Sequence, residues 1–373
     1  MSIEKGDATK YVHTGNGELC YELNKALTVP ETFPIYLSSA YIFDSIDPID
    51  KICDEGAPGY AYFRLGNPNA DATSQILAAG DGAEKGLVFS SGMAAITTSI
   101  LATVKPGDHI VASPIIYGEA FYYLKYELKR WGVETTFIDF NTQDVADYIR
   151  PNTKLVYGET IANPLMSVPD IQHLADVAHA NGAKLFIDNT FATPYNTTPL
   201  DLGVDAVIHS LTKYIGGHGD LLGGAVISND EQFLRECRLG TLMHFGSVMA
   251  PFTAFLVCRG LKTLGVRMKQ YNESALKIAK WLEANPKIET VRYPFLESNP
   301  QYTIAKKQMK GGGGMISFDV AGGLEAGKKF INSLKLCTLA VSLGDTETLV
   351  EQAAAMTHTM IPKEIREAAG ITD

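Results

Sequence analysis

The middle of the chain carries three groups of side chains that could do chemistry, each directly after a short apolar run. Ser90-Ser91-Gly92-Met93 follows such a run, and small residues that open a helix offer backbone N–H groups and a positive dipole end to an anion. Asp188 ends a second run, where an acid could keep a heterocyclic nitrogen protonated. Lys213 follows a third run, where burial would lower its pKa and favour a Schiff base.

Each group also has an ordinary structural interpretation. Ser91 could be a helix N-cap, Asp188 a cap or an ion-pair partner, and Lys213 an exposed residue at a strand end. The combination is more specific than any member, because pyridoxal phosphate needs a phosphate anchor, a partner for its pyridinium nitrogen and an amine that forms an imine. The three groups together therefore predict a site for this cofactor.

The elements that would position these residues form an alternating pattern between about residues 70 and 230. Helix-length amphipathic stretches, such as 118–129 and 169–180, separate short apolar runs that read as buried strands: 87–89, 109–112, 135–138, 155–157, 185–187 and 206–208. This succession predicts an α/β fold with a mostly parallel sheet that helices cover on both faces. Ligands bind at the carboxyl ends of such strands, which is where the three groups lie.

The two ends of the chain differ from this middle part. Residues 1–65 are irregular and contain four prolines, so we expect an arm; residues 66–260 form the cofactor-binding domain and 261–373 a smaller C-terminal domain. The last part has a helical pattern over about 250–285 and strand-like pieces at 290–293 and 315–318. The glycine run 311–314 between them lacks a strand-then-helix context, so we expect a flexible loop and not a phosphate-binding one.

Composition excludes several classes of function. The chain has 373 residues, 46% of them hydrophobic, and a formal charge of −10 from 32 Lys+Arg and 42 Asp+Glu, which argues against nucleic acid as the main partner. No apolar run reaches the roughly 20 residues that span a bilayer, and the first residues do not resemble a signal peptide. We therefore expect a soluble cytoplasmic protein without a membrane partner. The five scattered cysteines and eight histidines show no metal-ligand spacing, so metal catalysis is not indicated.

The sequence resembles a known family from about residue 30 to its C-terminus. The matching motifs are Tyr62-Phe63-Arg64-Leu65-Gly66-Asn67-Pro68, Ser90-Ser91-Gly92-Met93, Tyr117-Gly118, Glu159-Thr160-Ile161-Ala162-Asn163-Pro164, Asp188-Asn189-Thr190, Ser210-Leu211-Thr212-Lys213-Tyr214, Arg259-Gly260-Leu261-Lys262-Thr263-Leu264 and Ala340-Val341-Ser342-Leu343-Gly344. Together they resemble the Cys/Met-metabolism enzymes, which use pyridoxal phosphate. The resemblance implies the type I aminotransferase fold, with a seven-stranded sheet and a smaller C-terminal α+β domain.

The resemblance also implies roles for individual residues. Lys213 forms the imine with the cofactor and moves protons between Cα and Cγ, Asp188 pairs with the pyridine nitrogen, and Tyr117 stacks on the ring and acts as an acid or base. Further cofactor contacts are implied for Ser91, Gly92, Met93, Asn163, Ser210 and Thr212, and, from a neighbouring subunit, for Tyr62 and Arg64. Substrate contacts are implied for Ser342, Glu119 and Tyr62. The protein should accordingly be at least a homodimer, and the family is usually tetrameric.

Departures from the family pattern bear on the substrate. Cystathionine lyases carry charged residues where this chain has Ala61, Tyr122 and Val341, which would leave the distal charges of cystathionine uncompensated. The stretch 336–349 resembles methionine γ-lyases, although Glu119 stands where those enzymes have a cysteine, and Leu242 and Met243 stand where they have a Lys-Asp pair. In the family, the arginine that binds the substrate carboxylate comes shortly after a motif that matches residues 370–373 here. We therefore expect this arginine beyond Asp373 and a C-terminal domain that is truncated at its end.

These observations predict α,γ-elimination on a sulfur-containing amino acid, with L-methionine giving methanethiol, 2-oxobutyrate and ammonia. The first alternative is γ-replacement on O-acetyl- or O-succinylhomoserine, by a sulfhydrylase or a cystathionine γ-synthase. The next alternative is a cystathionine γ-lyase or β-lyase. A non-catalytic regulator on the same fold is a further alternative, against which Lys213, Asp188 and Tyr117 together argue.

Overall fold

A seven-stranded sheet forms the centre of the protein in the computed structural model, which describes residues 9–10, 30–43, 45–53, 57–357, 363–368 and 370–372. The strands follow the order β1 (Gly86–Phe89), β7 (Gly224–Ile227), β6 (Ala206–Ser210), β5 (Lys184–Asp188), β4 (Thr153–Glu159), β2 (His109–Ala112) and β3 (Glu134–Phe137). Neighbours from β6 to β3 pair in parallel, whereas β7 is antiparallel to both β1 and β6. The predicted mostly parallel sheet is therefore confirmed, with β7 as the reversed strand.

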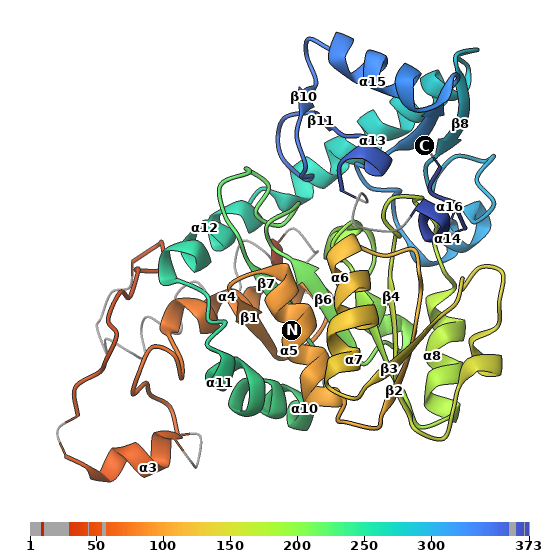
Figure 1. The fold of residues 1–373 in the computed structure, drawn as a ribbon. Coiled ribbons are helices and arrows are strands. Elements are labelled where there is room, and N and C mark those ends of the chain that lie inside the picture. Colours follow the sequence, from red (N-terminus) through yellow and green to blue (C-terminus); the bar gives the residue numbers. More distant parts are fainter. Residues whose placement is uncertain are drawn as a thin grey trace.

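Helices cover both faces of this sheet (Figure 1), because its strands are apolar on both sides. One hydrophobic core lies beneath α4 (Pro68–Asp81), α8 (Ile171–Ala180) and α12 (Pro251–Leu261). The other lies beneath α5 (Gly92–Thr103), α6 (Gly118–Tyr122), α7 (Leu128–Arg130) and α10 (Glu231–Glu236). The helix predicted over 118–129 is present, but it contains a π-helical turn, η1 (Tyr123–Glu127), between α6 and α7.

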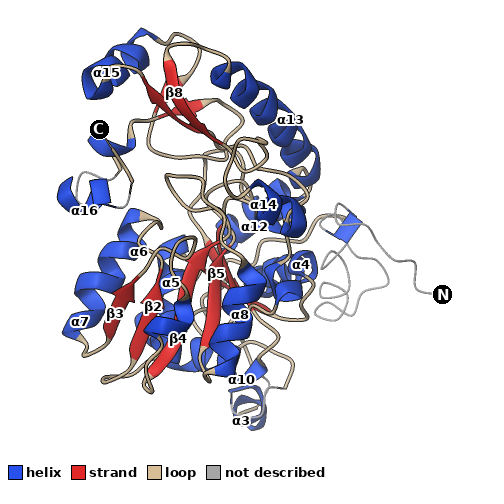
Figure 2. Cartoon of the chain, turned by 90° about the vertical axis from the view of Figure 1, so that its right-hand side faces the viewer, coloured by secondary structure: helices blue, strands red, loops and turns tan. Residues whose placement is uncertain are grey.

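A smaller layer lies beyond one end of the sheet strands (Figures 1 and 2). The long helix α13 (Leu264–Glu283) leads into this layer. The layer contains the antiparallel pair β8 (Ile288–Arg292) and β9 (Ser317–Val320) and the parallel pair β10 (Thr338–Leu339) and β11 (Leu349–Val350). Its helices are α14 (Tyr302–Gln308), α15 (Gly323–Ser333), α16 (Lys363–Ala368) and the short η5 (Ala353–Ala355). The strand-like pieces expected near 290 and 315 thus correspond to β8 and β9.

Shorter helices complete the described elements: α3 (Asp47–Cys53), α9 (Thr193–Asn196), α11 (Met243–Phe245), η2 (Val145–Tyr148), η3 (Pro199–Leu202) and η4 (Cys237–Leu242). Figure 1 shows α3 on an extended segment apart from the sheet, and Ile42 and Ile46 on this segment are 99% and 80% exposed. This agrees with an arm, although most of residues 1–29 lie outside the described residues. The division at residues 65 and 260 stays a prediction.

The glycine run Gly311–Gly314 is a loop, but the prediction that it is flexible was wrong. Gly311, Gly312 and Gly313 are buried, and an added Cβ on Gly312 would lie 2.6 Å from the Tyr293 ring. Gly313 donates its N–H to Asn272 Oδ1 at 2.8 Å and accepts a hydrogen bond from the Tyr293 hydroxyl at 3.0 Å. The glycines are required for close packing, which the sequence pattern does not distinguish from flexibility.

Two negative findings hold for the described part of the chain. No helix there has the length and apolar character needed to cross a bilayer. Nor do three or more His, Cys, Asp or Glu side chains gather there in a way that could hold a metal ion.

Candidate active site

The carboxyl ends of three central strands bring polar side chains together at one end of the sheet. This carboxyl-terminal end of the strands is called the sheet edge below. Glu159 ends β4 and Asp188 ends β5, and the two residues are directly opposite each other in the parallel register. Ser210 ends β6, and Lys213 lies in the turn that follows. The sheet topology therefore places these side chains in the region where α/β proteins bind ligands.

Lys213 is half-buried and directed toward the C-terminal layer. Its Nζ donates a hydrogen bond to Ser342 Oγ at 3.1 Å. Burial lowers the pKa of Lys213, while the nearby charge of Glu351 opposes that shift. An amine with a lowered pKa has more of the neutral form that attacks a carbonyl, so the environment suits imine formation.

The loop after Ser342 is pressed against the backbone of Lys213. Gly344 has φ +81°, and a Cβ there would lie 2.6 Å from the carbonyl carbon of Lys213 and 2.3 Å from the nitrogen of Tyr214. The Tyr271 hydroxyl holds the same loop by donating to the carbonyl oxygen of Asp345 at 2.8 Å. Only glycine combines this conformation with so close an approach.

Asp188 is 8% exposed and accepts the backbone N–H of Thr190 at 2.9 Å. Burial raises its pKa, while the hydrogen bonds from Thr190 and the charge of His209 partly offset the shift. A buried acid in this position can stabilise a cation on a ligand, because opposite charges attract strongly where water is excluded.

The residues expected to bind an anion lie close together where α5 meets the end of β6. The Ser91 side chain caps α5 by accepting the N–H of Ala94 at 3.0 Å, while a Cβ on Gly92 would lie 2.9 Å from the Cβ of Ser210. Thr212 Oγ1 accepts the N–H of Gly223 at 3.1 Å. The first turn of a 12-residue helix thus adjoins the hydroxyl residues after β6, and Met93 lies within that turn.

Tyr117 and Asn163 reach this edge from two loops that meet at Glu159. Tyr117 directly precedes α6 and is 41% exposed. Burial raises its pKa, and the charges of Glu119, Glu159 and Glu351 raise it further. The Tyr117 hydroxyl is therefore protonated at neutral pH and can act as a proton donor.

Tyr62 and Arg64 lie next to each other, and Arg64 contacts the segment at Met243. The Arg64 guanidinium carbon lies 5.8 Å from the centroid of the Tyr62 ring, and Arg64 Nη1 donates to the carbonyl oxygen of Met243 at 2.7 Å. Both side chains are exposed. Of the other positions that depart from the family pattern, Glu119 is exposed on α6, and Leu242 is buried in the second core.

Glu351 is a residue of the site that the sequence did not indicate. It follows β11 directly and accepts a hydrogen bond from Thr357 Oγ1 at 2.8 Å. Burial raises its pKa, while Thr357 and the charge of Lys213 lower it. Its neighbours in sequence form no motif that suggests chemistry, so only the fold reveals its position.

Behind the site, His209 of β6 and Asp81 of α4 form a fully buried ion pair with a 2.8 Å separation. His209 Nδ1 and Asp81 Oδ1 have no hydrogen-bond partner. Burial by itself lowers the pKa of His209, but the charge and hydrogen bond of Asp81 outweigh it, so that the pKa is raised.

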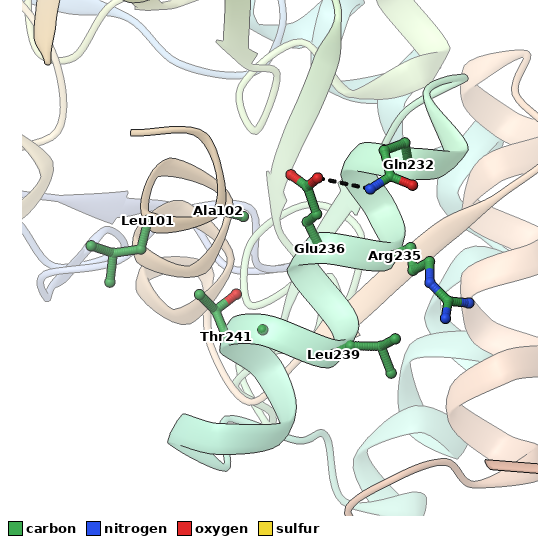
Figure 3. Close-up of a pocket in the computed structure, with 8 residues that line it drawn as sticks. Leu101, Ala102, Gln232, Arg235, Glu236, Leu239 and Thr241 are labelled. Carbon is green, nitrogen blue, oxygen red and sulfur yellow. Dashed lines mark hydrogen bonds between the residues drawn. The ribbon is translucent and has the colours of Figure 1, made fainter. Parts of the chain in front are cut away.

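A surface depression of about 500 Å³ lies elsewhere, between the last turns of α5 and the segment α10–η4 (Figure 3). Its lining includes Leu101, Arg235 and Glu236, and Gln232 donates to Glu236 along α10 at 2.8 Å. It contains none of the predicted site residues, and it lies at the opposite end of α5 from Gly92. We therefore place the candidate active site at the sheet edge and not in this depression.

The sequence profile of the Cys/Met metabolism PLP-dependent enzymes matches residues 8–373. The chain belongs to this family. An L-methionine gamma-lyase of Porphyromonas gingivalis is 45% identical over 100% of this chain and 92% of its own length. A cystathionine gamma-lyase of Bacillus subtilis is 43% identical over 84% of this chain and 83% of its own. The crystal structure of a cystathionine gamma-lyase from Lactobacillus plantarum, complexed with L-serine, has a TM-score of 0.90, 36% identity and coverage of 99% and 92%.

Membership makes the protein a pyridoxal-phosphate-dependent enzyme, and the sheet edge fits that cofactor. The half-buried Lys213 supplies an amine with a lowered pKa, and Asp188 supplies a buried carboxylate. The close approach of Gly92 and Ser210 leaves no room for a Cβ, as is typical where backbone N–H groups approach a phosphate. The type I fold of the family agrees with the observed sheet.

Proposed function

We propose that this enzyme catalyses α,γ-elimination on a sulfur-containing amino acid, with L-methionine and water giving methanethiol, 2-oxobutyrate and ammonia. The observation that carries the proposal is the half-buried Lys213, whose amine contacts Ser342 on one side and is influenced by the charge of Glu351 on the other. The similarity to methionine gamma-lyases over the full chain supports this substrate.

Under this proposal the cofactor is held by residues of the sheet edge. Lys213 would bind it covalently, Asp188 would pair with its ring nitrogen, and Tyr117 would stack on its ring. The remaining contacts come from Ser91, Gly92, Met93, Asn163, Ser210 and Thr212. When bound, pyridoxal phosphate stabilises the negative charge that develops next to the substrate's amino group.

The residues of this chain then move three protons. The Lys213 amine, displaced by the substrate amine, would remove the proton from Cα as a general base and would give that proton up again before it takes a second one, from Cβ. The Tyr117 hydroxyl, which its raised pKa keeps protonated, donates a proton to the sulfur as the Cγ–S bond breaks. Ser342 and Glu119 contact the substrate, and Ser342 also orients the Lys213 amine.

The arm completes the site of a second subunit in this proposal. Tyr62 and Arg64 are exposed, and under this proposal they contact the cofactor phosphate, and Tyr62 the substrate, in a neighbouring copy. The functional unit is then at least a homodimer, and we propose a homotetramer with a cytoplasmic location.

The test is release of 2-oxobutyrate from L-methionine by the cofactor-loaded enzyme without an added thiol. Lys213→Ala should abolish both the absorbance of the protein-bound imine and turnover, whereas Lys129→Ala, at an exposed position of α7, should preserve both. Absence of 2-oxobutyrate from a loaded enzyme that instead converts O-acetylhomoserine and a thiol would replace elimination by γ-replacement. In that case Glu119, Leu242 and Met243 would account for the altered pocket.

A further inference from the structure

Glu159 is a buried carboxylate to which the proposed reaction assigns no step. It is 6% exposed, ends β4 near the centre of the sheet and lies opposite Asp188 on β5. Two acidic side chains in register at one buried sheet edge are unfavourable if both are charged and unpaired. The position of Glu159 therefore needs an explanation in its hydrogen bonds.

Both carboxylate oxygens of Glu159 accept hydrogen bonds from backbone groups of separate loops. Oε1 accepts the N–H of Tyr117 at 2.7 Å, and Oε2 accepts the N–H of Asn163 at 3.1 Å. Tyr117 lies 42 positions before Glu159 in the sequence and belongs to the connection between β2 and α6. One side chain thus joins three segments of the sheet edge.

The acceptor of the Tyr117 N–H is the Glu159 carboxylate. Tyr117 directly precedes the first residue of α6, and its own side chain makes no capping hydrogen bond to this helix. Two N–H donors that converge on one side chain require two acceptors, which a carboxylate provides and an amide does not. Glutamine in this position would offer one oxygen and would turn an NH₂ group toward the second donor.

We propose that Glu159 is a positioning residue, which fixes Tyr117 and Asn163 relative to Asp188 through these two backbone hydrogen bonds. The consequence for catalysis rests on the proposed function, because it assumes that the Tyr117 ring and hydroxyl act on the cofactor and substrate. Burial and the charge of Asp188 raise the pKa of Glu159, while the two backbone hydrogen bonds oppose that rise.

Amide hydrogen exchange tests the two hydrogen bonds directly in the full-length protein without cofactor. Hydrogen bonds to charged groups contribute about 1.5–3 kcal/mol, so Glu159→Gln should speed exchange at the amide of Tyr117 or Asn163 by roughly ten- to a hundredfold. Thr160→Val is a matched control from the same loop, because the Thr160 hydroxyl donates at 2.7 Å to Asn189 and not to the Glu159 carboxylate. Its exchange at residues 117 and 163 should equal that of the wild type.

The result that overturns the inference is unchanged exchange at both amides in a folded Glu159→Gln protein. If that variant does not fold, Glu159→Asp decides in its place: it keeps the charge but is one methylene shorter, so exchange should still increase at one of the two amides. Turnover of L-methionine by the cofactor-loaded Glu159→Gln enzyme tests the proposed function separately. Faster exchange with an unchanged kcat would support the hydrogen bonds and contradict the assigned role of Tyr117.

Discussion

Lys213 and Ser342 are 129 positions apart in the sequence, and the Lys213 amine nevertheless donates to the Ser342 hydroxyl at 3.1 Å. The lysine belongs to the turn after β6, and the serine to the layer that carries β10 and β11. The Lys213 amine is therefore hydrogen-bonded to a part of the chain that contributes no strand to the seven-stranded sheet.

Replacement of Ser342 by alanine should reduce turnover without preventing cofactor loading. The Lys213 amine would lose an acceptor but keep its half-buried position, so the imine absorbance should persist while kcat/KM for L-methionine falls by roughly tenfold, as expected for about 1–2 kcal/mol of one hydrogen bond. Unchanged kcat/KM would show that the contact does not contribute to the reaction.

Replacement of Glu351 by glutamine should make Lys213 more reactive at low pH. Burial lowers the pKa of Lys213 and the Glu351 charge raises it, so removal of that charge should lower the pKa further. In the protein without cofactor, the pH at which Lys213 is acetylated at half its maximal rate should decrease. Glu119→Gln is the control, because Glu119 influences Tyr117 and is not among the charges that shift Lys213.

Gly344→Ala should destabilise the protein more than Gly82→Ala does. Both glycines have left-handed backbones, with φ +81° and φ +78°, so each substitution costs about 1–2 kcal/mol in conformational strain. A Cβ on Gly82 meets nothing within 4 Å, whereas one on Gly344 would lie 2.3 Å from the nitrogen of Tyr214. Thermal unfolding measures the difference, and equal shifts of the two midpoints would refute the close contact.

His209→Gln should lower stability by about 3–5 kcal/mol, because it leaves the buried Asp81 without its partner. The folded-state pKa of His209 is raised, so its protonation stabilises the fold fully below the unfolded value of about 6.5, and this contribution is lost as the pH rises through the folded pKa. The gap in melting temperature between wild type and variant should accordingly narrow above pH 6.5. His179→Gln, at an exposed ion pair with Asp205, should show little effect at any pH.

Much of the fold followed from hydrophobic periodicity, since six apolar runs correspond to β1 through β6. The apolar pattern did not predict β7, because Gly223 and Gly224 stand at its start. Its reversed direction could not be predicted either, because it depends on pairing with β1. The sequence pattern did not indicate the burial of Gly311–Gly313 either. Lys213 and Asp188 stood out because a charged residue after an apolar strand is unusual. Glu351 did not, because its importance depends on contacts that are distant in sequence.

The place of β7 between β1 and β6 has a consequence for biosynthesis. During translation, β1 leaves the ribosome long before β7, which is its neighbour in the sheet. Until Gly224–Ile227 has been made, the apolar β1 cannot pair as it does in the native sheet, and such strands associate with other chains. The growing chain thus depends on delayed pairing between distant segments, the kind of topology that folds slowly. Fragments that end before Gly224 retain this exposed strand permanently.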